Sequence, residues 1–151
     1  MTTRTLLLTL HIASVTGWLG ADILQYVISP RLERSDRTVA LAWARVQLML
    51  HEKYYAVVVV VVLATGVLLV LDGDWPWSSG FIWVGVGAIV GGATLGGQGL
   101  RTLTKKRVVA LEAGDDAAAA QASRRAFPLS MIVSALPLIA ILAMVDKWHA
   151  G

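Results

Sequence analysis

The chain has 151 residues, of which 56% are hydrophobic and only 15% are charged, and its net charge at pH 7 is +3. An ordinary soluble domain is about 45–50% apolar, so this composition favours a protein that lies in a lipid bilayer. The mean hydropathy of +0.67 points the same way. The chain has no cysteine, which excludes disulfide bonds, thiolate chemistry and cysteine-based metal sites.

Four apolar runs reach or approach the length of about 20 residues with which a helix crosses the hydrocarbon core of a membrane. They are residues 6–28, 49–71, 81–100 and 127–145. A helix satisfies its own backbone hydrogen bonds, as a lipid environment requires. We therefore expect an all-α membrane protein, in which residues 1–151 form a single integral membrane domain built as a four-transmembrane-helix bundle.

The first run, 6–28, carries a line of polar and aromatic side chains. At alternating spacings of three and four residues, one helix face holds His11, Ser14, Trp18, Asp22, Gln25 and Ser29. An imidazole and a carboxylate within a membrane span are costly and are usually functional. These residues, the length of the run and the lack of a small-residue cleavage site also favour a retained span over a secretory signal.

His11 and Asp22 are eleven residues apart in the sequence, which is roughly 16 Å along a helix axis. The stripe therefore predicts two separate polar points, not one acid–base pair. For the second point we expect a polar site of Asp22 and Gln25 with Gln98 and Arg101 from the third run. A structural buried pair and a proton-transfer carboxylate both fit that expectation.

The connection 29–48 is expected to contain a helix that Ser35 and Asp36 cap and that runs straight into the second span. Met49 and His51 at its end are copper ligands in type, but two such residues are more typical of an interfacial histidine beside charged neighbours. The connection 101–126 breaks at Gly114, where Asp115 and Asp116 open a second helix, so a helical hairpin is predicted there.

Lysine and arginine gather in two of the three connections, around 29–53 and in 101–126, whereas 72–80 has none. The positive-inside rule therefore places both basic connections in the cytoplasm and both termini outside, with the plasma membrane as the location. The lipid bilayer, including anionic inner-leaflet lipids, accounts for the net positive charge, and nucleic acid is not an expected partner.

The third run, 81–100, is rich in glycine, which lets helix backbones approach closely. Its glycines are Gly85, Gly87, Gly91, Gly92, Gly96, Gly97 and Gly99. They predict tight packing inside the bundle. They also suit two other hypotheses, a flat cofactor that needs room and a second protomer or membrane-complex partner on the Gly85 to Gly99 face.

The string Leu10-His11-Ile12-Ala13-Ser14-Val15-Thr16-Gly17-Trp18-Leu19-Gly20 resembles the first span of a superfamily of small four-helix membrane proteins. That superfamily includes the HemJ-type protoporphyrinogen oxidases, the membrane domains of copper-resistance D proteins and an uncharacterised family of predicted integral membrane proteins, to which the chain is most similar. The resemblance implies His11 as a ligand of haem b, with Trp18 and Gly20 in the same cofactor-binding motif.

The third run contains neither the lysine that those oxidases carry there nor any histidine, so their enzymatic activity is not carried over, and whether the chain is an enzyme stays open. Two main hypotheses follow: a haem-binding or redox-associated membrane protein with His11 as axial or metal ligand, and a cofactor-free accessory or assembly subunit of a membrane complex. A small proton-coupled or copper-handling membrane protein is a third.

Overall fold

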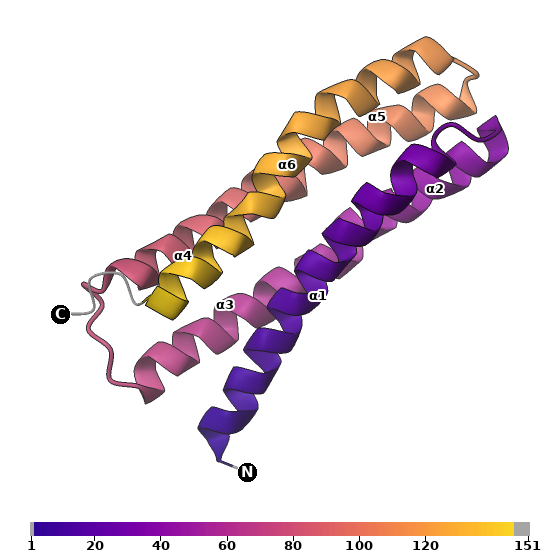
Figure 1. Cartoon of the computed structure of the whole chain (residues 1–151). Helices are drawn as coiled ribbons and strands as arrows, with labels where there is room; N and C mark the ends of the chain where they lie inside the picture. The colour runs from indigo at the N-terminus through magenta and orange to yellow at the C-terminus, as the bar shows by residue number, and fades with distance from the viewer. Residues whose placement is uncertain (1, 147–151) are drawn as a thin grey trace.

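The computed structural model describes residues 2–146, all of whose regular structure is helical (Figure 1). Its elements form four continuous rods joined by short links. The first rod is α1, Thr3–Leu32, and the fourth is α6, Asp116–Asp146. The second consists of α2 (Arg37–Met49), the π-helical η1 (Leu50–Tyr54) and α3 (Tyr55–Asp72), and the third of α4 (Gly80–Gly91), the π-helical η2 (Gly92–Leu100) and α5 (Arg101–Glu112).

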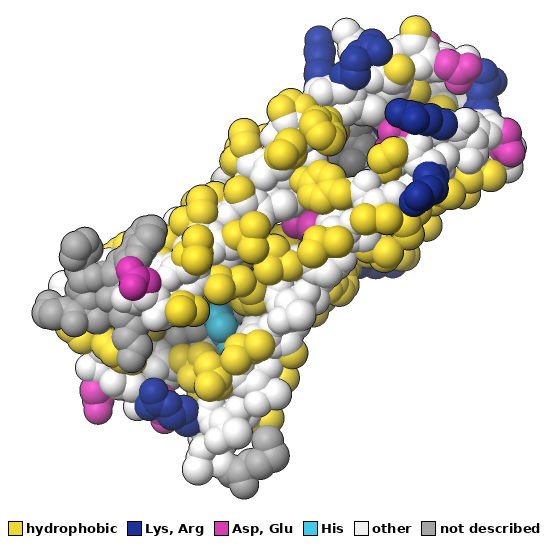
Figure 2. Space-filling model, in the orientation of Figure 1, with side chains coloured by type: hydrophobic (Ala, Val, Ile, Leu, Met, Phe, Trp, Pro, Cys, Tyr) yellow, Lys and Arg dark blue, Asp and Glu magenta, His cyan; other side chains and the backbone are white. Residues whose placement is uncertain are grey.

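All four rods are long and apolar enough to cross a membrane. The predicted all-α, four-helix architecture is therefore confirmed. The rods have 30, 36, 33 and 31 residues, which at 1.5 Å per residue gives roughly 45–54 Å, well beyond the ~30 Å of hydrocarbon. Hydrophobic side chains cover their outer surfaces, and Lys and Arg side chains gather where α1 joins α2 and α5 joins α6 (Figure 2). We call this end the connection end, and the opposite end, where α1 begins and α6 stops, the terminal end.

Local signals set the helix boundaries at the connection end. The Asp36 side chain accepts a hydrogen bond from the Val39 amide at 3.0 Å and caps α2, as predicted. Gly114 ends α5 with a φ of 76°, a conformation that glycine adopts without strain. Asp115 then caps α6 by accepting from the Ala118 amide at 2.9 Å, so the predicted helical hairpin is confirmed.

The rods associate as two pairs (Figure 1). α1 lies along α3, whereas α6 lies along α4, η2 and α5. One core cluster, at the connection end, is made of small and branched side chains that include Ala44 and Val108. A second cluster centres on Trp18 and joins both pairs through Val58, Val62, Leu100 and Val133.

The glycines of α4 and η2 allow close packing inside this bundle, as predicted. A Cβ atom at most of these positions would meet a side chain of α6, namely Met144, Leu136, Val133 and Leu129 for Gly85, Gly91, Gly96 and Gly99. A Cβ at Gly92 would instead meet Trp18 of α1. Only Gly87 and Gly97 of this run have no such neighbour within 4 Å, so most of the glycine face is occupied by the chain itself.

Candidate functional site

Two cavities lie along the seam between the helix pairs. The first has a volume of about 320 Å³, lies toward the terminal end and is lined by His11. The second, of about 720 Å³, reaches from the middle of the bundle to the connection end and is lined by Asp22. Trp18 lines both cavities. We call them the His11 cavity and the Asp22 cavity; the sequence predicts their separation, because the two residues lie three helical turns apart.

A hydrogen bond to α3 orients the His11 ring. His11 is buried, and its Nδ1 lies 2.9 Å from the Thr65 Oγ1. The Thr65 hydroxyl has one proton, which it donates to the Val61 carbonyl at 2.6 Å. Thr65 therefore accepts from His11 Nδ1–H, which assigns the imidazole to the tautomer with a free lone pair on Nε2.

The wall of the His11 cavity is mostly apolar. Gly66 lies against the imidazole, since a Cβ there would be 3.4 Å from His11 Cε1. Met144 is the one other described wall residue with a donor atom suited to a soft metal. The described residues contain no group of three or more His, Cys, Asp or Glu side chains that could hold a metal ion.

Asp22 is held by hydroxyl groups. Its Oδ1 accepts from the Tyr55 hydroxyl at 2.5 Å and its Oδ2 accepts from the Ser134 hydroxyl at 2.8 Å. The expected partners from the third run do not reach it. Arg101 instead donates to Glu52 at 2.9 Å, and Gln98 is exposed. Helix rotation, which the sequence does not reveal, turns Arg101 toward Glu52 of η1.

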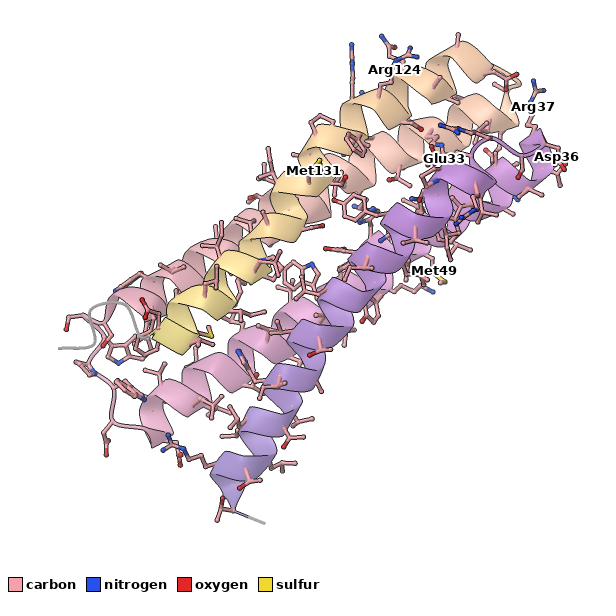
Figure 3. All side chains as sticks on the ribbon, viewed as in Figure 1. Glu33, Asp36, Arg37, Met49, Arg124 and Met131 are labelled. Carbon is pink, nitrogen blue, oxygen red and sulfur yellow. The ribbon has the colours of Figure 1, made fainter. Side chains whose placement is uncertain are left out.

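A chain of hydrogen bonds connects Asp22 with the connection end. The predicted site residue Gln25 donates to the Tyr55 hydroxyl at 2.8 Å, and Gln47 donates to Gln25 at 3.4 Å. Arg107 donates to Gln47 at 3.0 Å and to Glu33 at 2.6 Å. The side chains that make these bonds line the Asp22 cavity, and Figure 3 labels Glu33 among them. Burial lowers the pKa of the Arg107 guanidinium, and the nearby Glu33 carboxylate counteracts that effect.

Trp18 forms the wall between the cavities. Its side chain is 4% exposed, and its ring packs edge-on against Tyr55 with centroids 6.2 Å apart. The indole N–H is directed toward Asp22 one turn along α1 but makes no hydrogen bond of ordinary geometry with any described residue. The middle of the bundle therefore holds a buried indole N–H beside a carboxylate.

The remaining predicted residues lie elsewhere. Gly20 is exposed with no neighbour within 4 Å of its Cβ position, and it lines neither cavity. His51 stacks on Tyr55 with ring centroids 5.6 Å apart, in the Asp22 cavity and not beside His11. Met49 is exposed on the outer surface of its helix (Figure 3).

Sequence reasoning missed Thr65, Tyr55, Ser134, Gln47 and Arg107. One of them had a signal: Thr65 is the one hydroxyl-bearing residue between positions 56 and 71, a stretch otherwise of aliphatic side chains and glycine. A lone hydroxyl in such a run commonly serves a polar partner on another helix. The others gave no comparable signal.

Comparison of the chain with protein-family models, curated proteins and solved structures finds no match in any of the three. The four apolar rods place the chain in the class of multi-pass α-helical membrane proteins.

Proposed function

We propose that the protein binds haem b in the membrane through His11. The orientation of the imidazole carries the proposal: Thr65 holds Nδ1, and the Nε2 lone pair remains for a metal beside an apolar cavity. Histidines that bind metals are commonly oriented in this way by a partner on the other ring nitrogen. The resemblance of residues 10–20 to the first span of haem-binding four-helix proteins supports the same residue.

The donor set of the His11 cavity fits haem. His11 and the Met144 thioether, which both line this cavity, would hold the iron, and histidine with methionine is an established haem ligation. The Trp18 ring would pack beside the macrocycle. The cavity volume of about 320 Å³ is at the lower end of the ~300–1,000 Å³ range of small-molecule sites. Binding of haem would therefore widen the seam between the helix pairs. When bound, haem would supply one-electron redox chemistry.

We also propose that the connection end faces the cytoplasm of a cell whose plasma membrane holds the protein. Lysine and arginine gather at that end, whereas the link 73–79 at the terminal end has none. Arg4 is the described basic residue at the terminal end, and it lies 3.7 Å from Asp72, which offsets its charge.

The test of haem binding is a visible spectrum. We would purify the protein in mild detergent, add haemin, and record reduced-minus-oxidised spectra of the wild type, His11→Ala and the matched control His51→Ala. A Soret band in the wild type and in His51→Ala, lost in His11→Ala, is the expected result. No band in the wild type would reject haem and favour the cofactor-free accessory subunit, whereas a band that survives His11→Ala would reject the ligand.

A further inference from the structure

We propose that the Asp22 cavity binds a lipophilic ammonium compound, whose cationic head pairs with the Asp22 carboxylate. This site is separate from the haem proposal, since His11 does not line the Asp22 cavity. Three features of the cavity carry the inference: Asp22 has no positively charged partner, the walls suit an apolar body, and the arginines nearer the connection end are paired with other carboxylates.

Asp22 lacks a positive partner. It is 8% exposed, and among residues 2–146 no lysine, arginine or histidine forms an ion pair with it. Two hydroxyl groups, which are neutral, donate to its oxygens. A buried carboxylate requires a proton or a cation, because an isolated buried charge is very costly.

The walls around Asp22 suit an apolar body larger than a proton or a metal ion. Gly97 leaves open space on one side of the cavity, since a Cβ there meets nothing within 4 Å, and Val59, Leu100 and Val133 supply aliphatic surface. The Trp18, Tyr26 and Tyr55 rings line the same part of the cavity, and aromatic faces attract ammonium groups.

The arginines that line the same cavity nearer the connection end do not supply the missing charge. Arg107 is paired with Glu33, and Arg101 is paired with Glu52. Each of these two cations is thereby neutralised by a carboxylate of its own. Arg34, the third arginine of the wall, is exposed and lies twelve residues beyond Asp22 in the sequence, which is roughly 18 Å along a helix axis. Asp22 is left as the one carboxylate of the cavity wall without a basic partner among the described residues.

The test is isothermal titration calorimetry of the protein in lipid nanodiscs, with empty nanodiscs as the blank. The probe is 4-phenylbutylammonium, and the uncharged 4-phenylbutanol is its control. Asp22→Asn keeps the shape of the side chain and removes the charge. Asp72→Asn is the matched control, because Asp72 lies at the end of α3, outside the Asp22 cavity.

Asp22→Asn is expected to weaken binding of the ammonium by roughly 30-fold or more, the usual cost of removing one member of a buried charge pair. Asp72→Asn and His11→Ala should bind as the wild type does, and the alcohol should bind more weakly than the ammonium. Equal binding of the ammonium to the wild type and Asp22→Asn, or of the alcohol and the ammonium to the wild type, would overturn the proposal.

A second variant keeps the test valid if Asp22→Asn does not fold. Gly97 lines the cavity, and a Cβ there meets nothing within 4 Å. Gly97→Leu should therefore fold and fill the cavity, and we expect it to weaken binding roughly tenfold or more. Unchanged binding in folded Gly97→Leu would place the probe elsewhere and overturn the proposal.

Discussion

Gly92→Ala is expected to destabilise the bundle at one of the contacts between its two helix pairs, that of η2 with α1. A Cβ at Gly92 would lie 2.7 Å from Cη2 and 3.0 Å from Cζ2 of Trp18. The indole cannot swing aside without cost, because its side chain is only 4% exposed and also packs against Tyr55. One methyl group would therefore push the α4–α6 pair away from α1.

Two terms decide the magnitude. Alanine is better than glycine in a helix by about 0.5–1 kcal/mol, and this gain applies to any glycine of the rod. Extra atoms in a filled interior cost about 1–3 kcal/mol. Gly87 of α4 provides the matched control, because its Cβ position has no neighbour within 4 Å. We expect Gly87→Ala to be neutral or stabilising, and Gly92→Ala to be less stable than Gly87→Ala by about 1–3 kcal/mol.

The assay is unfolding by SDS in mixed micelles, followed by circular dichroism. A double-mutant cycle with Trp18→Phe isolates the contact, because phenylalanine lacks the distal ring atoms that meet the new methyl group. Gly92→Ala should cost much less in that background. Equal stabilities of Gly92→Ala and Gly87→Ala, or an unchanged cost beside Phe at position 18, would refute the packing argument.

Three further predictions concern polar groups and topology. Thr65→Val removes the hydroxyl that accepts from His11 Nδ1–H. It should cost about 1–3 kcal/mol of stability and weaken haem binding by about 10–100-fold in a spectral titration, and unchanged haem affinity would contradict the orienting role of Thr65. Arg107→Gln leaves Glu33 unpaired. Breaking a buried ion pair costs ~3–5 kcal/mol of stability, and we expect the lower end of that range because the Glu33 side chain is 28% exposed. Arg107→Gln with Glu33→Gln should recover much of the lost stability, and a double variant as unstable as the single one would argue against the pair. Because the chain has no cysteine, single cysteines introduced as Ser35→Cys and Ser78→Cys report topology with a membrane-impermeant maleimide. Ser78→Cys should react in intact cells and Ser35→Cys only after lysis. The opposite pattern would show that the orientation is the reverse of the one proposed.

The helical framework could be predicted because its signals are local. Asp36 caps the helix that begins one residue later, and Gly114 interrupts the hairpin with its positive φ. The length of each apolar run likewise depends on neighbouring residues alone. The ends of the rods are a different matter: the helices continue past the expected spans into both connections, since polar residues there still support helix.

The partners of the polar residues could not be predicted because they depend on helix rotation and register. Thr65 is 54 positions from His11, and Ser134 is 112 positions from Asp22. A periodic stripe shows which residues share a face of α1, but it does not show which residues of α3 and α6 that face meets. Arg101 illustrates the limit: it lies at a suitable depth for Asp22, yet its side chain turns to Glu52.

Trp18 explains how one stripe on α1 forms two sites of different chemistry. His11 and Asp22 face the same seam between the helix pairs, and without the indole between them the two cavities would merge. On one side is an imidazole among mostly apolar walls, suited to a metal. On the other is a carboxylate among hydroxyl and aromatic groups, suited to a cation. Trp18 is the one described residue that lines both cavities. His11→Ala and Asp22→Asn should therefore act independently, each removing one ligand and sparing the other.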